Sequence, residues 1–227
     1  MKIVPGILES NFETILSKMD SIFPGSETIQ IDVCDGEYVE SRTWPHVEPA
    51  ISRELATAEL QKRKQAGQAV EFDLMIQNPE KTLFNWLSMN PSHIWIHFGS
   101  TNNLTHCFSL MRGYQMDYPK FTYGIAVTNT TPVDSYSKYI RMIDSIQVMG
   151  IAQVGKQGES FEEATFDTIA SIQAIDPEIP IQVDGGVSDV VLSRLKSVGI
   201  TNAVCGSAVF GGPEPLESLQ RLQSLVE

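Results

Sequence analysis

Gln30-Ile31-Asp32-Val33-Cys34-Asp35-Gly36 combines alternating apolar and polar residues with an acid and a glycine at its end. Thr28–Val33 predicts an apolar strand that ends in carboxylates and a glycine. Side chains alternate along a strand, so Gln30 and Asp32 share one face and the apolar residues between them share the other. Polar side chains on the inward face of a short apolar strand are costly unless they are paired or functional.

A second stretch, Ile179-Pro180-Ile181-Gln182-Val183-Asp184-Gly185-Gly186, has the same form far along the chain. Asp184 follows an apolar strand directly, as Asp32 does. Two strands that each carry an acid at the carboxyl end predict one site, assembled from distant parts of the sequence.

Composition narrows the class of protein. The 227 residues are 42% hydrophobic and 19% charged, which is typical of a globular chain. A net charge of -12 argues against a nucleic-acid surface but still allows a small phosphorylated ligand. The 3 cysteines form no CxxC pair, and Met1–Pro5 has no signal-peptide character. No apolar run approaches membrane length, so we expect a cytoplasmic protein without a membrane or nucleic-acid partner.

Strand-like and helical segments alternate through the sequence, without a linker between them. The predicted strands are Ile3–Leu8, Thr28–Val33, Ala69–Ile76, His93–Phe98, Phe121–Thr128, Ser145–Ile151, Ile179–Asp184 and Asn202–Cys205. The predicted helices are Asn11–Phe23, Val47–Ala66, Pro79–Met89, Asn102–Gln115, Val133–Arg141, Phe161–Ile175, Ser188–Ser197 and Pro215–Val226. This order favours a single α/β domain over residues 1–227, a (β/α)₈ TIM barrel. A doubly wound open sheet is less favoured, because no GxGxxG follows the first strand.

In such a barrel the carboxyl ends of the strands carry the site. The residues at those ends include Asp32, Asp35, Asp73, Met75, His97, Thr128, Asn129, Met149, Asp184, Gly206 and Ser207. Glycine lets the backbone approach an anion closely, and the last two strand–helix loops usually bind phosphate in this fold. We therefore predict a phosphate site at Gly185, Gly186, Gly206 and Ser207, with the loop Gln153–Gly158 closing over it.

Several segments, in order along the chain, together resemble the ribulose-phosphate 3-epimerase family. They are Pro5–Leu8, Gln30–Gly36, Asp73–Glu80, Gly124–Val127 with Thr131-Pro132, Val148–Phe161, Asp184–Val187 and Gly206–Phe210. The resemblance runs nearly end to end and implies a ribulose-phosphate-binding barrel that acts on a phosphorylated sugar in the pentose phosphate pathway, as a homo-oligomer.

The resemblance also implies a mechanism. Two aspartates of the family exchange protons at C3 on opposite faces of the sugar, through an enediolate, and they correspond to Asp32 and Asp184. Inversion requires an acid and a base on opposite faces, each with an adjusted pKa. The family's pocket methionines correspond to Met75 and Met149, and its Gly-rich phosphate loop to a stretch that includes Gly155 and Gly158.

The metal site departs from the family pattern. The two family histidines correspond to Gln30 and Asp73, whereas the two aspartate ligands remain as Asp32 and Asp184. Three carboxylates and an amide favour Mg²⁺ or Mn²⁺ over Zn²⁺ or Fe²⁺, and the sequence equally allows no metal. Further departures are Gly6, Cys34 and an added lysine, Lys156.

Some residues at the strand ends and in the loops also have purely structural interpretations. We expect Asp35 to accept backbone N–H groups in a turn, and His97 to be a satisfied core histidine. His46, His93 and His106 are interpreted as surface or packing residues, and Lys156 is as compatible with solvent as with phosphate. Three functions stay open: a ribulose 5-phosphate/xylulose 5-phosphate epimerase, a metal-free isomerase of another sugar phosphate, and a non-catalytic sugar-phosphate-binding relative.

Overall fold

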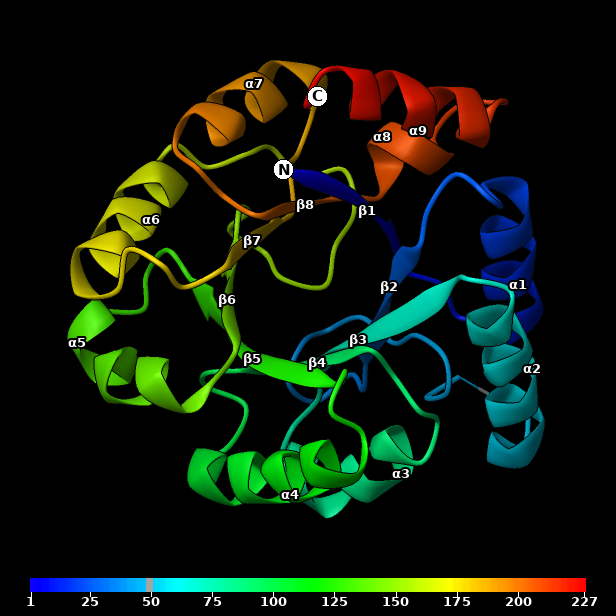
Figure 1. The fold of residues 1–227 in the computed structure, drawn as a ribbon, viewed down its shortest axis with the longest axis horizontal. Helices are drawn as coiled ribbons and strands as arrows, with labels where there is room; N and C mark the ends of the chain where they lie inside the picture. The colour runs from blue at the N-terminus through cyan, green and yellow to red at the C-terminus, as the bar shows by residue number, and fades with distance from the viewer. Residues whose placement is uncertain (48–50) are drawn as a thin grey trace.

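Eight parallel strands close into a barrel in chain order in a computed structural model, which describes residues 1–47 and 51–227. Figure 1 looks down the barrel from the end where the strands begin. The strands are β1 Lys2–Ile7, β2 Thr28–Cys34, β3 Ala69–Met75, β4 His93–His97, β5 Thr122–Thr128, β6 Ser145–Met149, β7 Ile181–Asp184 and β8 Asn202–Cys205. The prediction of a (β/α)₈ TIM barrel is confirmed.

Helices surround the ring of strands (Figure 1). They are α1 Phe12–Ser21, α2 Arg53–Gln65, α3 Leu83–Leu87, α4 Leu104–Asp117, α5 Val133–Tyr136, α6 Ala164–Ile175, α7 Asp189–Ser197, α8 Ser207–Phe210 and α9 Pro215–Ser224, with 3₁₀ turns η1 Pro79–Lys81 and η2 Ser137–Met142. Among the described helices, none combines the length and the apolar character that a bilayer crossing needs.

The main core lies between the strands and the helices. Ile29, Ile31 and Val33 on the outward face of β2 are fully buried, and the same apolar cluster contains Phe12 and Ile15 of α1. Burying a side chain of this size stabilises a fold by about 1.5–3 kcal/mol. Period-two alternation in the strands therefore sends the apolar residues outward to the helices and the polar ones inward.

Three predicted helices differ from the structure. Pro79–Met89 is not one helix, because its 3₁₀ turn gives way to α3 at Thr82. Val133–Arg141 likewise divides into α5 and the 3₁₀ turn η2. The prediction Val47–Ala66 crosses residues 48–50, which lie outside the described part, and α2 itself begins only at Arg53. The Ser52 hydroxyl accepts the N–H of Leu55 as a helix cap, so α2 begins directly after Ser52.

The barrel interior is unusually polar. Bulky branched residues normally fill a TIM barrel, but here Gln30, Glu71, Asp73, Gln147 and Gln182 are all buried inside it. Buried polar groups cost free energy unless they are hydrogen-bonded, so such an interior requires a connected network.

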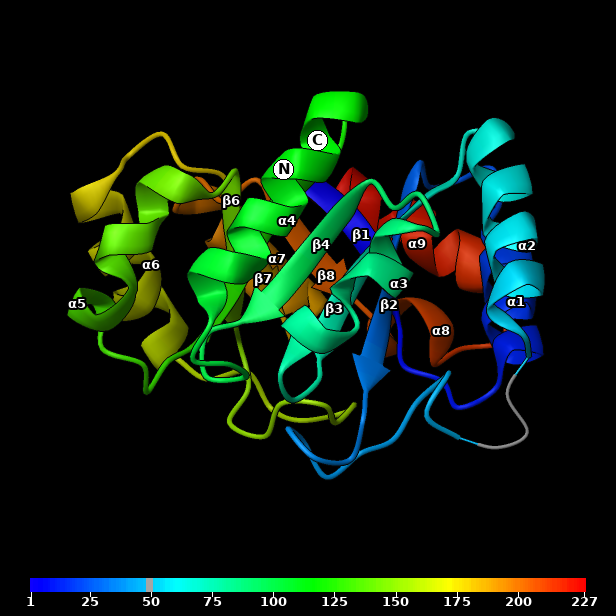
Figure 2. The same cartoon turned by 90° about the horizontal axis from the view of Figure 1, so that it is seen from below.

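The two mouths of the barrel differ. Figure 2 shows the strands running toward one mouth, where the loops after β2 and β6 lie, while both chain ends lie at the other. A cavity of about 1040 Å³ opens at the mouth where the strands begin, and Glu71, His93 and Trp95 are among its lining residues.

The three cysteines are free and buried.

Candidate active site

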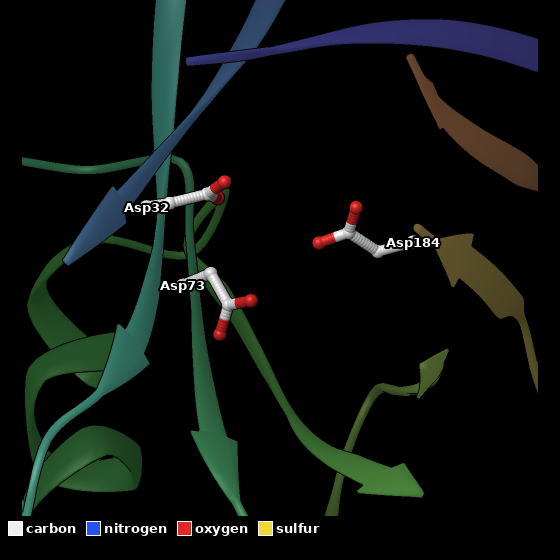
Figure 3. Close-up of side chains that lie close together, drawn as sticks. All are labelled: Asp32, Asp73 and Asp184. Carbon is white, nitrogen blue, oxygen red and sulfur yellow. The ribbon is translucent and has the colours of Figure 1, made fainter. Parts of the chain in front are cut away.

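Three aspartates converge at the carboxyl ends of the strands. Asp32 and Asp73 are register partners on the neighbouring strands β2 and β3, and Asp184 comes from β7 on the other side of the barrel (Figure 3). Each offers an oxygen within 4.8 Å of the others. The strand-end prediction for Asp32, Asp73 and Asp184 thus places three carboxyl groups around one point.

Gln30 lies two residues before Asp32, on the same inward face of β2. Its Nε2 donates to Asp32 Oδ1 at 2.8 Å and to Asp184 Oδ2 at 2.7 Å. Its Oε1 faces the opposite way and accepts from Gln182 Nε2 at 2.9 Å. The two acids are therefore held together through one amide nitrogen, and the amide oxygen predicted as a metal ligand points away from them.

Asp73 is held from two sides. His97 Nε2 lies 2.8 Å from Asp73 Oδ1, and Gln147 Nε2 donates to Asp73 Oδ2 at 2.9 Å. His97 is fully buried, as expected of a core histidine, and its ring lies 5.3 Å from that of Tyr38. Its Nδ1, however, has no hydrogen-bond partner among the described residues. Asp73 thus sits deeper than a solvated strand-end acid would.

Burial sets the protonation of the acid pair. It raises the pKa of Asp184 to about 7, and the nearby Asp73 charge acts in the same direction. Burial, and then the charges of Asp184 and Asp73, raise the pKa of Asp32 well above its ordinary value. Like charges this close cannot all ionise at their usual pKa. The pair consequently keeps a proton at a pH where exposed aspartates have lost theirs.

The donor set fits a hard divalent cation. Asp32 and Asp184 each use one oxygen for Gln30, and no protein donor among the described residues takes the second oxygen. Three convergent carboxylates supply the oxygen ligands that Mg²⁺ and Mn²⁺ prefer. In this orientation Gln30 would contribute hydrogen bonds to two of the ligands, as partners behind a metal commonly do.

A small cleft of about 60 Å³ opens directly above the acids. Ten of the predicted site residues line it, namely Asp32, Met75, Met149, Gly155, Gly158, Asp184, Gly185, Gly186, Gly206 and Ser207. Gln30 and Asp73 are fully buried and do not line it. The predicted catalytic, pocket and phosphate residues therefore share one space, and the remaining predicted metal residues contact the two acids that line it.

The loop after β6 folds over this cleft. A Cβ on Gly206 would lie 3.2 Å from Gln157 Nε2, so that side chain rests on the β8 loop. Gly186 has φ +66°, and a Cβ there would lie 2.6 Å from the backbone of Phe161. Only glycine fits such a position. No described backbone carbonyl accepts the N–H of Gly186 or Gly206, which leaves both groups available to an anion.

The structure also places the remaining polar residues that the sequence analysis interpreted, which lie around the site or away from it. Asp35 accepts the backbone N–H groups of Glu37, Tyr38 and Gln77, as predicted for a turn residue. Lys156 is paired with Gln153 and Glu40 at the rim. His93 is a buried packing residue that contacts Thr122 and Trp95, and His106 is exposed.

Sequence reasoning missed three polar residues behind the site and a fourth, Gln157, that lines the cleft itself. Glu71, Gln147 and Gln182 each stand two residues before a site residue on their strands, so the same period-two alternation that placed Gln30 could have found them. Gln157 carried no comparable signal, because its position depends on the path of a loop.

Comparisons with known proteins agree with this architecture. The model of the ribulose-phosphate 3 epimerase family matches residues 2–210. The chain is 23% identical to the ribulose-phosphate 3-epimerase of Mycobacterium bovis over 97% of this chain and 91% of that protein. It is also 23% identical to the enzyme of Schizosaccharomyces pombe, over 99% of this chain and 93% of that one.

Solved structures show the same fold at low identity. KGPDC from Streptococcus mutans in complex with D-R5P has a TM-score of 0.76 at 11% identity, covering 99% of this chain and 96% of that one. A 3-hexulose-6-phosphate synthase has a TM-score of 0.73 at 14% identity, covering 100% of both chains. Because the family model spans nearly the whole barrel, this chain belongs to the ribulose-phosphate 3-epimerase family.

Proposed function

We propose that this protein epimerises a ketose phosphate at C3, with ribulose 5-phosphate and xylulose 5-phosphate as the nominal pair. The observation that carries the proposal is the placement of Asp32 and Asp184 on opposite sides of the barrel, at the floor of one cleft. Inversion at carbon needs a base on one face and an acid on the other, and this arrangement supplies both.

The raised pKa values support the same roles. A sugar that lies between Asp32 and Asp184 loses its C3 proton to whichever carboxylate is ionised and gains one on the other face from its protonated partner. An enediolate stands between these two steps. Because both carboxyl groups titrate above their ordinary range, one can hold a proton while the other is free to accept one at neutral pH.

Asp32, Asp73 and Asp184 would hold Mg²⁺ or Mn²⁺, and such an ion supplies positive charge to the enediolate oxygens when it is bound. Gln30 would then keep Asp32 and Asp184 oriented through its two hydrogen bonds. The same bridge favours a second candidate, a metal-free epimerase, because the amide N–H groups already offset the charge of two acids.

The other end of the substrate would lie against the glycine loops. Gly186 and Gly206 line the cleft with N–H groups that meet no acceptor among residues 1–47 and 51–227, and Ser207 adds a hydroxyl. Backbone amides of this kind bind phosphate without a net positive charge nearby, which agrees with an acidic chain. Met75 and Met149 would pack against the sugar carbons. The cytoplasmic location and the homo-oligomer remain predictions.

A coupled assay for xylulose 5-phosphate tests the proposal. The protein is stripped of metal and then supplied separately with Mg²⁺, Mn²⁺, Zn²⁺ or Fe²⁺. Turnover restored by Mg²⁺ or Mn²⁺ supports the metal-assisted epimerase, and turnover without added metal supports the metal-free one. Binding of ribulose 5-phosphate without turnover under every condition would refute catalysis and identify a sugar-phosphate-binding relative.

A further inference from the structure

Three glutamines inside the barrel connect the aspartates to a fourth acid, Glu71. Gln182 Nε2 lies 2.6 Å from Glu71 Oε1, 2.9 Å from Gln30 Oε1 and 2.9 Å from Gln147 Oε1. All of these residues are buried. One amide nitrogen thus stands at the branch point of the network, and because its NH₂ group has two hydrogens for three oxygens, one hydrogen is shared between two of them.

The direction of every amide in this network follows from Glu71. The indole N–H of Trp95 can only donate, and it points at Glu71 Oε1 from 3.3 Å. That oxygen is therefore an acceptor, and Gln182 must turn its NH₂ group toward it. Gln182 Oε1 faces the other way and accepts from Asn202 Nδ2 at 3.0 Å, and since the Asn202 amide can present either atom, it follows the orientation of Gln182.

Gln30 and Gln147 take their orientation from Gln182. The side-chain oxygens of Gln30 and Gln147 both face the NH₂ group of Gln182. Their own NH₂ groups therefore face the aspartates. Gln30 then donates to Asp32 and Asp184 (their carboxylates appear in Figure 3), and Gln147 donates to Asp73. A reversed amide would instead point an oxygen lone pair at the ionised carboxylates, which can only accept, and this is repulsive.

We propose that Glu71 and Gln182 are positioning residues, which hold Gln30 and Gln147 with their N–H groups toward the three aspartates. The role belongs to the proposed epimerase and rests on that function. Neither residue lines the cleft above the acids. Both line the cavity at the opposite mouth instead. They act on the reaction only through the orientation of two amides.

The side chain at position 71 needs an accepting oxygen for this role, but it does not need a charge. Both donors converge on Oε1, whereas Oε2 has no hydrogen bond to the described residues and Glu71 borders the cavity. A single accepting oxygen at this place satisfies both donors. An amide oxygen can do the same, so Glu71→Gln should preserve the network.

The test uses four variants of the full chain. Glu71→Met removes the acceptor at nearly constant length. Glu71→Gln keeps it, and Trp95→Phe removes only the other donor. The double variant Glu71→Gln/Gln182→Glu exchanges the two groups, so that charge and composition stay constant while residue 182 becomes an acceptor. Gln30 and Gln147 would then turn their N–H groups away from the aspartates.

Two quantities are measured in each variant. The first is hydrogen-exchange protection of the Gln30 and Gln147 side-chain NH₂ groups by NMR, assigned by their loss in Gln30→Met and Gln147→Met. The second is kcat and KM for ribulose 5-phosphate. We expect Glu71→Met and the exchanged double variant to change the amide signals and to lower kcat by about 10- to 100-fold. KM should stay close to wild type, because the phosphate loops are untouched.

Glu71→Gln and Trp95→Phe should keep both the amide protection and kcat. Unchanged amide signals in the exchanged double variant would overturn the proposal, as would a loss in Glu71→Gln equal to that in Glu71→Met. Wild-type protein without epimerisation would refute the proposed function alone, because the amide signals still report the orientation. The double variant keeps the test valid if Glu71→Met does not fold.

Discussion

Gln30 on β2 donates a 2.7 Å hydrogen bond across the barrel to Asp184 on β7. The residues are far apart in sequence, and the contact exists only because the closed sheet brings opposite strands to one axis. The same nitrogen reaches Asp32, so the two acids share one donor, while their second oxygens accept from no donor in the described ranges and can meet a proton, a cation or a substrate.

The acid pair should be essential for turnover and costly for stability. Asp32→Asn and Asp184→Asn are each expected to lower kcat by about 10²- to 10⁴-fold, because each removes one side of the proton exchange. Both should also raise Tm, since each removes a buried charge that its neighbours repel.

Steady-state assays and thermal unfolding check this, with Asp35→Asn as the matched control. Asp35 is held by three backbone N–H groups away from the acid pair. That variant should lose stability and keep kcat. An Asp184→Asn protein with wild-type turnover would show that Asp184 is not part of the chemistry.

Asp73 should matter for metal binding. Asp73→Asn is expected to weaken Mn²⁺ binding by about 10- to 100-fold, because it removes one of three convergent carboxylates. Calorimetric titration of stripped protein with Mn²⁺ measures the change. Equal affinity in wild type and Asp73→Asn would exclude Asp73 as a ligand.

The metal preference itself can be shifted. Gln30→His/Asp73→His introduces imidazoles where the family pattern has histidine ligands, and nitrogen ligands suit Zn²⁺ and Fe²⁺ better than Mg²⁺. We expect competition binding to show a change of order in favour of Zn²⁺. An unchanged preference for Mg²⁺ or Mn²⁺ would mean that positions 30 and 73 do not contact the ion.

The phosphate end should respond to charge. Ser207→Asp places a carboxylate at the cleft beside Gly206, where an anion is proposed to bind. We expect KM for the sugar phosphate to rise by about 10²-fold or more with little change in kcat. Ser188→Asp, at the start of α7 and outside the cleft lining, is the control. A similar KM in both variants would place the phosphate elsewhere.

Acid should destabilise the fold through His93. Burial lowers the pKa of His93 to about 3 from 6.5, so the unfolded state binds a proton that the folded state refuses. Stability is therefore complete above pH 6.5 and falls as the pH drops toward 3. Between pH 6.5 and pH 5 the loss from this one group is about 2 kcal/mol. Urea unfolding of wild type and His93→Phe at both pH values measures it. Equal pH dependence in the two proteins would contradict the assignment.

Periodicity made much of this structure predictable. Alternation placed Asp32 and Gln30 on the inward face, and parallel strands necessarily bring the ends of β2 and β7 to one mouth. The amide orientation of Gln30 was not predictable, because it depends on Gln182 and Glu71 through contacts between strands. The sequence predicted the loop Gln153–Gly158 over the phosphate site, but the contact of Gln157 with Gly206 was not predictable, since Gln157 belongs to no periodic element.

Solvent-deuterium incorporation into ribulose 5-phosphate, followed by NMR, reports proton exchange at C3, the step on which the proposed epimerase depends. We expect loss of the C3 proton signal together with appearance of xylulose 5-phosphate for the wild type, and neither for Asp184→Asn. A C3 signal that persists with the wild type, in stripped protein and with each of Mg²⁺, Mn²⁺, Zn²⁺ and Fe²⁺, would contradict the proposed function.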